Sequence, residues 1–124
     1  MKKIISTTNA PAAVGPYSQA VMYGDMLYTS GQIGLNPATG AFAGDDIATQ
    51  AKQVCENLKA VLAEAGMTFD NVIKTTCFLA EISDFAAFNA IYADYFVSLP
   101  ARSCVSAKDL PKGALCEIEV IAAK

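Results

Sequence analysis

The feature that most constrains how this chain folds is a one-sided helical pattern over residues 47–65. Apolar side chains recur there every three or four residues, which gathers them on one face of a helix. Asp45 or Asp46 is suited to cap the start of this helix, and Gly66 stands where a helix commonly ends. A helix with a single apolar face covers only one side of its neighbour, so the rest of the chain must supply a surface for it.

That surface is predicted to be a β-sheet. Apolar and β-branched runs bounded by turn residues indicate strands at residues 3–6, 18–23, 26–33, 72–79, 102–107 and 115–122. Gly24 and Asp25 mark a hairpin turn between the second and third of these strands. A second amphipathic helix is expected from residue 83 or 84 to about residue 97, with an aromatic stripe as its buried face.

The order of these elements predicts an α+β fold, a mixed sheet with two helices packed on one face. At 124 residues the chain has the length of one domain, which we expect to span residues 1–124. Neither helix covers the second face of the sheet. Only 17% of the residues are charged, against about 25% in a typical soluble domain. We therefore expect copies of the chain to cover that face in a homo-oligomer.

Charge and residue content exclude several kinds of function. The net charge is −3 and the lysines are scattered from Lys2 to Lys124, whereas a nucleic-acid-binding surface needs clustered basic groups. The chain contains no histidine, which excludes Ser-His-Asp and Cys-His catalysis and imidazole-ligated metals. The apolar runs are too short for a transmembrane helix, and the N-terminus lacks the apolar core of a signal peptide.

The four cysteines, Cys55, Cys77, Cys104 and Cys116, form no Cys-x-x-Cys pair, so zinc-ribbon and thioredoxin-type sites are not expected. Most of them stand in apolar runs, which is typical of small buried hydrophobic residues. Two disulfides are an alternative, but the pattern favours free thiols in a reducing cytoplasm. Because no histidine can activate Cys104, we expect an inert thiol there.

Arg102 is the only arginine and lies in a mostly apolar stretch. Its guanidinium suits a carboxylate or phosphate ligand, but a structural ion pair is an equally good interpretation. Glu117 and Glu119 alternate with apolar residues, so both face away from the helices. If the last two strands pair, Arg102 and a glutamate converge in an interface pocket. Solvation at a sheet edge or an ion pair with Arg102 is the structural alternative, which the residues alone favour slightly.

Two further polar features border the apolar pattern. Asn89 lies beside the aromatic stripe of the second helix, where an amide more commonly caps a strand than binds a ligand. The run from Ser30 to Gly34 includes Gly31 and offers backbone amides that suit an anion. This run lacks the spacing and the lysine of a nucleotide-binding loop.

Five short blocks stand out along the chain: GPYSQA at 15–20, TSGQI at 29–33, FNAIY at 88–92, PARSCV at 100–105 and EIE at 117–119. Together they resemble the Rid family of reactive-intermediate (imine) deaminases, also called YjgF-like proteins, and most closely its RidA branch. The resemblance spans nearly the whole chain. It implies a chorismate-mutase-like α+β fold and a homotrimer with its sites at subunit interfaces.

The resemblance also implies an activity, the hydrolysis of enamine and imine intermediates such as 2-aminoacrylate and 2-aminocrotonate to 2-oxo acids and ammonia, without a cofactor or metal. In this family pattern Arg102 holds the substrate carboxylate, and Glu117 positions water or carries protons. The remaining pocket residues that it implies are Tyr17, Ser30, Gly31, Asn89 and the backbone of Cys104.

Two other functions compete with this one. A non-catalytic regulatory trimer would use the same Arg102 site to sense 2-oxo acids. A ribonuclease or translation inhibitor is opposed by the acidic balance, the single arginine and the missing histidine. The expected partners are therefore small 2-imino or 2-oxo acids and copies of the chain, with no nucleic acid and no membrane.

Overall fold

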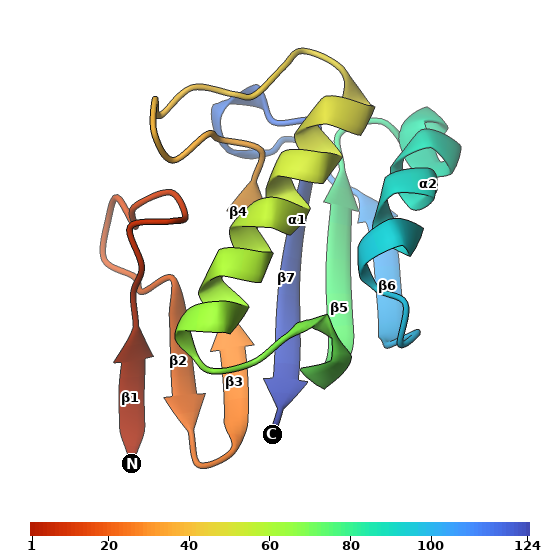
Figure 1. Ribbon diagram of the computed structural model, residues 1–124. Helices are drawn as coiled ribbons and strands as arrows, with labels where there is room; N and C mark the ends of the chain where they lie inside the picture. The colour runs from red at the N-terminus through yellow and green to blue at the C-terminus, as the bar shows by residue number, and fades with distance from the viewer.

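A computed structural model covering residues 1–124 shows one mixed sheet of seven strands (Figure 1). The strands follow the order β1-β2-β3-β7-β5-β6, and β4 also pairs with β7. β5 and β6 are parallel, and all other paired strands are antiparallel. The strands are β1 (Lys2–Ile5), β2 (Ala20–Tyr23), β3 (Met26–Thr29), β4 (Gln32–Ile33), β5 (Val72–Leu79), β6 (Ala101–Ser106) and β7 (Cys116–Ala123).

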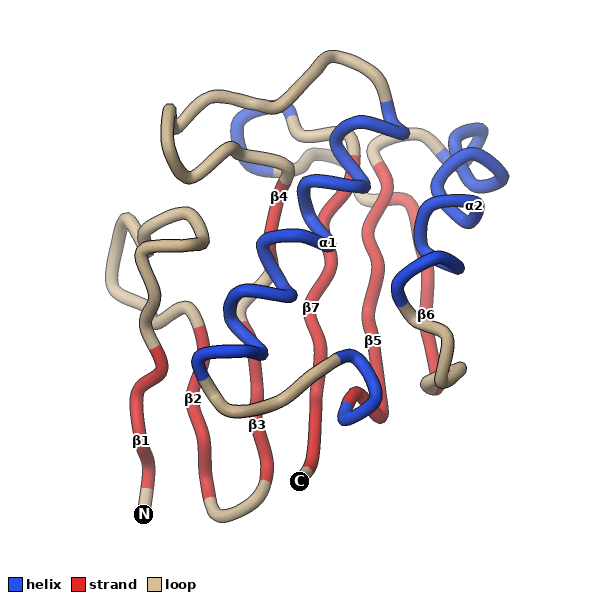
Figure 2. The backbone as a smooth tube through the Cα atoms, viewed as in Figure 1, coloured by secondary structure: helices blue, strands red, loops and turns tan.

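Two helices, α1 (Ile47–Glu64) and α2 (Phe85–Tyr95), lie on one face of this sheet (Figures 1 and 2). Asp46 caps α1, because its carboxylate accepts a hydrogen bond from the Thr49 N–H at 3.0 Å. Beyond the other end, Gly66 adopts a φ of +74°, a left-handed conformation that glycine takes without strain. The predicted fold class and order of elements are confirmed, although α2 ends slightly earlier than expected. None of the helices combines the length and apolarity needed to cross a membrane.

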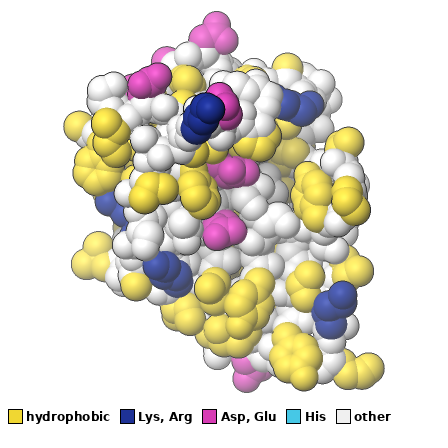
Figure 3. All heavy atoms as spheres, turned by 180° about the vertical axis from the view of Figure 1, so that it is seen from behind, with side chains coloured by type: hydrophobic (Ala, Val, Ile, Leu, Met, Phe, Trp, Pro, Cys, Tyr) yellow, Lys and Arg dark blue, Asp and Glu magenta, His cyan; other side chains and the backbone are white.

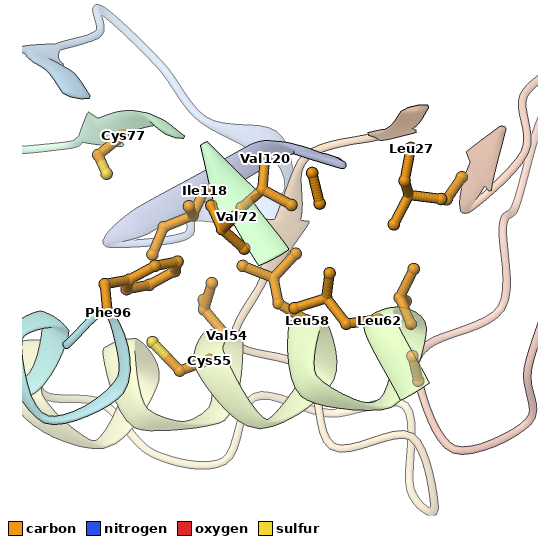
Figure 4. Packing of buried hydrophobic residues seen from close by; sticks show 14 of the residues in the cluster. Leu27, Val54, Cys55, Leu58, Leu62, Val72, Cys77, Phe96, Ile118 and Val120 are labelled. Carbon is orange, nitrogen blue, oxygen red and sulfur yellow. The ribbon is translucent and has the colours of Figure 1, made fainter. Parts of the chain in front are cut away.

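The core lies between the two helices and the near face of the sheet (Figure 4). Leu58 of α1 and Ile118 of β7 are both fully buried in it. The helical period in α1 and the alternation in β7 therefore point their apolar residues into the same layer. All four cysteines are free thiols. Three of them are buried, as the sequence predicted, and Cys104 is half-buried.

The expected third strand is divided into β3 and β4, so the prediction of one continuous strand was wrong. The chain leaves the ladder at Ser30 and Gly31. Thr29 stabilises the break, since its hydroxyl accepts a hydrogen bond from the Val120 N–H at 3.0 Å. The Ser30 hydroxyl in turn donates to the Ser18 carbonyl at 2.6 Å. A side-chain hydroxyl thus replaces a strand carbonyl at this point, and Ser30 and Gly31 line a cleft.

The last two strands are not neighbours, so the pairing on which the expected meeting of Arg102 and Glu117 depended is wrong. β5 lies between β6 and β7. The cause is the connection through α2, because a helical crossover from one strand to the next joins parallel strands, here β5 and β6. β6 is therefore an edge strand with one unpaired side, and β5 separates Arg102 from Glu117.

The second face of the sheet has no helix over it (Figure 1). Strand alternation places Tyr23, Tyr28 and Val105 on this face, and all three are exposed. Glu117 and Glu119 lie on it too, because the residues that alternate with them in β7 are buried in the core. Figure 3 shows acidic groups near the middle of this side and apolar side chains around them. The expected uncovered face is therefore present, and it carries exposed apolar side chains.

Candidate functional site

The predicted site residues fall into two groups. A cleft of about 640 Å³, here called the glutamate cleft, is lined among others by Tyr17, Ser30, Gly31 and Glu117. A hollow of about 320 Å³ beside α2 and the edge strand β6, here called the arginine pocket, is lined among others by Asn89 and Arg102. Cys104 follows Arg102 on the same strand.

The two groups lie on opposite sides of the sheet. Arg102 faces α2, because its guanidinium contacts side chains of that helix. Glu117 faces the uncovered side. One chain therefore does not bring Arg102 and Glu117 together, and each group holds only part of the predicted set.

A buried amide side chain fixes the loop that forms one wall of the glutamate cleft. Gln19 is only 3% exposed. Its Nε2 donates to the carbonyls of Thr7 and Pro11 at 3.0 and 2.8 Å, and its Oε1 accepts from the Thr7 N–H at 2.7 Å. Both ends of the amide are satisfied by the chain that leads from β1 toward Tyr17, so this irregular segment has one defined path.

Two buried amides of α1 fix the chain on the other side of the cleft. Asn57 donates from Nδ2 to the carbonyls of Ile33 and Leu35 at 3.1 and 2.9 Å. Gln50 Oε1 accepts from the Leu115 N–H at 2.9 Å, just before β7. Sequence reasoning missed these residues. The available signal was an amide at positions that the helical period assigns to the buried face of α1.

Gly31 lets the Glu117 carboxylate approach the backbone of the β3–β4 break. A methyl group on Gly31 would lie 2.5 Å from Glu117 Oε2, closer than packed atoms approach. The Gly31 N–H makes no hydrogen bond within the chain. An unpaired donor and a carboxylate therefore stand side by side in the wall of one cleft.

The environment of Glu117 alters its acidity. Burial raises the pKa of this half-buried carboxyl above the ordinary value of 4.5, and the like charge of Glu119 raises it further. A carboxyl with a raised pKa exchanges protons closer to neutral pH, which suits a general acid or base.

Arg102 is held by α2 without a carboxylate partner. Its Nη1 donates to Asn89 Oδ1 at 2.7 Å. Its Cζ lies 4.7 Å from the centre of the Tyr92 ring and 5.5 Å from that of Phe85. No Asp or Glu oxygen lies within 4.0 Å of the guanidinium. The structural ion pair considered from the sequence is therefore wrong, and the charge of Arg102 is uncompensated within the chain.

Asn89 and Cys104 differ in what they offer a ligand. The Asn89 amide neither caps a strand nor is free, since its oxygen accepts from Arg102 and so orients the guanidinium. Burial raises the pKa of the Cys104 thiol, and the nearby charge of Arg102 offsets only part of this rise. This agrees with an inert thiol. No set of three or more His, Cys, Asp or Glu side chains is arranged to hold a metal ion.

Comparison with known proteins relates nearly the whole chain to one family. Residues 7–124 match the family model described as Endoribonuclease L-PSP. A Lactococcus lactis protein named "Putative regulator AldR" is 56% identical over 121 residues, which cover 97% of this chain and 96% of that protein. The mouse protein named 2-iminobutanoate/2-iminopropanoate deaminase is 49% identical over 123 residues, which cover 98% of this chain and 91% of the mouse protein.

Solved structures show the same relation at the level of the fold. The crystal structure of YyfA from Yersinia pestis, described as a protein of unknown function of the conserved Rid family, superposes with a TM-score of 0.97. The two sequences are 52% identical, and the superposition covers 100% of both chains. The similarity thus includes every element that forms the glutamate cleft and the arginine pocket.

Proposed function

The chain belongs to the Endoribonuclease L-PSP family, also known as the Rid or YjgF-like proteins, and we propose that it is a deaminase of reactive imines. The proposed substrates are enamine and imine intermediates of the 2-aminoacrylate and 2-aminocrotonate type, and the products are 2-oxo acids and ammonia. This is the activity in the name of the mouse relative. We assign it to residues 1–124 as one domain.

The observation that carries the proposal is the uncompensated guanidinium of Arg102. A planar fork of N–H donors binds a carboxylate through two parallel hydrogen bonds, and every 2-imino acid carries a carboxylate. Asn89 occupies one Nη1 donor, and Tyr92 and Phe85 contact the guanidinium through their rings. The other N–H donors of Arg102 are left for a ligand.

We further propose a homotrimer in which the arginine pocket of one copy meets the glutamate cleft of the next. The uncovered sheet face supports this assembly, because Glu117 lies on it and because exposed apolar side chains surround acidic groups on this side (Figure 3). The free edge of β6 supports it too, because it carries Arg102 and Cys104 to the margin of the molecule. A site shared between copies unites the two groups that one chain keeps on opposite sides.

In this shared site Arg102 binds the substrate carboxylate, which places the imine carbon near Glu117 of the neighbouring copy. The Glu117 carboxylate takes a proton from water as the oxygen adds to that carbon, and returns it to the nitrogen. Transfer of the remaining hydroxyl proton to the nitrogen breaks the C–N bond, and ammonia and the 2-oxo acid leave. Because an imine carbon is already electrophilic, positioning and one proton carrier suffice without a cofactor.

The other predicted residues form the walls of the site. The unpaired Gly31 N–H is a donor for a substrate oxygen. Tyr17 lines the cleft and is 53% exposed, so its ring is available to a ligand or a neighbouring copy. Ser30 shapes the break, since its hydroxyl is bound to a backbone carbonyl. Cys104 contributes through its backbone on the free edge of β6.

A second function, a non-catalytic trimer that senses 2-oxo acids, is favoured by one observation, the regulator name of the 56% identical relative. Such a sensor uses Arg102 in the same way but has no need of Glu117 as a proton carrier. Ribonuclease activity, which the family description names, has less support, because the chain has a net charge of −3, one arginine and no histidine.

We place the protein in a reducing cytoplasm, because its four cysteines are free. This compartment also suits imines that soluble enzymes of amino-acid breakdown release.

The test is a coupled assay in which a serine/threonine dehydratase that uses pyridoxal phosphate releases the imine. Formation of the 2-oxo acid is followed with and without this protein. We expect the wild type to accelerate it and Arg102→Ala to have no effect on the rate. A folded wild type that leaves the rate unchanged but binds 2-oxobutanoate through Arg102 would be a sensor and not a deaminase.

A further inference from the structure

One largely buried side chain that lines the arginine pocket, Tyr92, contacts Arg102. Tyr92 of α2 is 9% exposed, and the centre of its ring lies 4.7 Å from Arg102 Cζ. Its hydroxyl shares a 2.8 Å hydrogen bond with Oγ1 of Thr75, which is fully buried. Thr75 and Arg102 are register partners on β5 and β6. The ring is therefore anchored at its hydroxyl end by the strand next to the one that carries the arginine.

α2 presents one stripe of side chains to the guanidinium. Phe85, Asn89 and Tyr92 are spaced by four and three residues, which places them on one helix face. All three contact Arg102. Tyr92 also stacks on Phe96, with ring centres 4.2 Å apart and an interplanar angle of 18°. Contacts with the strand, the helix and the guanidinium thus leave Tyr92 little freedom to rotate.

We propose that Tyr92 is a positioning residue for carboxylate binding: anchored by Thr75, its ring holds the Arg102 guanidinium in the orientation that receives the substrate. This inference rests on the proposed role of Arg102. An aromatic face attracts a cation without occupying its N–H donors. An acidic side chain in the same place would also hold the arginine, but it would take the donors that the substrate carboxylate needs.

Matched substitutions in α2 separate positioning from packing. Tyr95 is the control, because its hydroxyl also bonds across the fold, to Glu56 at 2.7 Å, and its ring takes no part in the cation–π contacts of Arg102. We expect Tyr92→Leu to raise KM about tenfold, and Tyr92→Phe, which keeps the ring but loses the anchor, to raise it about two- to threefold. In both variants kcat should stay near the wild-type value, and Tyr95→Leu and Tyr95→Phe should keep the wild-type KM.

Equal changes of KM at positions 92 and 95 would overturn the inference, because they would show a packing effect only. If Tyr92→Leu does not fold after losing its buried ring, the comparison of Tyr92→Phe with Tyr95→Phe decides. A KM that rises only in Tyr92→Phe supports positioning, and an unchanged KM in Tyr92→Phe overturns it.

A second readout does not depend on activity. The chain has one arginine, so it gives one arginine Nε–H signal in a ¹H–¹⁵N spectrum. A proton above an aromatic face resonates upfield, and we expect this shift for Arg102 in the wild type and in Tyr95→Leu. In Tyr92→Leu the shift should be clearly smaller, because only the more distant Phe85 ring remains. A signal at the position of free arginine in the wild type would overturn the inference even if Arg102→Ala is inactive. The upfield shift together with a fully active Arg102→Ala would instead contradict the proposed function.

Discussion

At the scale of single residues, the proposed chemistry depends on Glu117, whose pKa is raised by burial. Glu117→Gln keeps the shape of the side chain but removes the proposed proton carrier, so we expect kcat to fall by about 10²–10⁴-fold while 2-oxo acid binding persists. The same change should raise the melting temperature at pH 7. Because the pKa of Glu117 is raised in the folded state, the free energy of unfolding of the wild type falls as pH rises through that pKa. The glutamine amide does not titrate, so the variant has no such loss.

Glu119→Gln is the matched control for this prediction. It removes the like charge that contributes to the raised pKa of Glu117, so the variant should stay active. The acid limb of its kcat/KM profile should move to lower pH, because the Glu117 carboxylate then forms more readily. An unchanged kcat in Glu117→Gln would exclude it as the proton carrier, and equal losses in both variants would point to the charge of the pair instead.

Arg102 offers a test of geometry against charge. Lysine supplies a positive charge but not a planar fork, so Arg102→Lys should be nearly as impaired as Arg102→Ala. We expect a loss of about 2–4 kcal/mol in kcat/KM from the lost charge-assisted contact. Steady-state kinetics in the coupled assay measure this difference. Recovery of most activity by lysine would show that charge alone is enough.

Gly31 matters for the space it leaves. In Gly31→Ala the new methyl group would lie 2.5, 2.7 and 2.9 Å from Oε2, Cδ and Cγ of Glu117, so this side chain must move away. The displaced carboxylate should lower kcat at least about tenfold, since a proton carrier must stay within reach of the water. Gly44→Ala is the control, because its methyl group meets the Thr49 side chain outside both hollows. Similar kinetics for the two variants would contradict this role of Gly31.

At the scale of elements, apolar periodicity predicted which segments form helices and strands and which face of each is buried. It did so because one amphipathic α1 and one alternating β7 share a core layer. Periodicity says nothing of lateral neighbours, however, and the order of β5, β6 and β7 is set by the crossover through α2. That is why the residues of the candidate site were recognisable from the sequence while their distribution over two faces was not.

The loops were the other part that periodicity could not predict. Their paths depend on hydrogen bonds between buried amides and distant backbone groups, as Gln19 illustrates with Thr7 and Pro11. The break between β3 and β4 depends likewise on the hydroxyl of Thr29. Such hydrogen bonds join positions that are far apart in the sequence, so no local sequence pattern predicts them.

Gln19→Leu tests how much one of these amides contributes. The change leaves buried carbonyls of the cleft wall without a donor, so we expect a loss of about 1–3 kcal/mol in unfolding free energy. KM should rise with it, because the wall of the cleft loosens, while kcat changes less. Asn71→Leu is the control, since the Asn71 amide also bonds distant backbone, the Ala123 carbonyl at 3.1 Å, but lines neither hollow, so this variant should keep the wild-type KM. Denaturant unfolding and steady-state kinetics of both variants check this, and equal effects on KM would contradict it.

At the scale of the whole molecule, the proposed site depends on two surfaces that one chain leaves incomplete. The arginine pocket opens beside the free edge of β6, and the glutamate cleft borders the uncovered face. Both surfaces are unfinished in one chain of 13.0 kDa. In the proposed trimer each copy completes the site of its neighbour, so the proposed assembly and the proposed catalysis depend on the same geometry.

The site shared between neighbouring copies is tested most directly by mixing two inactive variants in one assembly. Arg102→Ala and Glu117→Gln are co-expressed, and sedimentation first establishes that each forms a trimer of three 13.0 kDa chains. If every site takes its arginine from one copy and its glutamate from the next, random mixing restores roughly one quarter of the sites. The copy that supplies the arginine carries Arg102 in about half of the sites, and independently the next copy carries Glu117 in about half of them. We therefore expect about a quarter of wild-type activity in the coassembled protein. Activity no higher than that of the two parents would place both residues in sites within one chain and contradict the account.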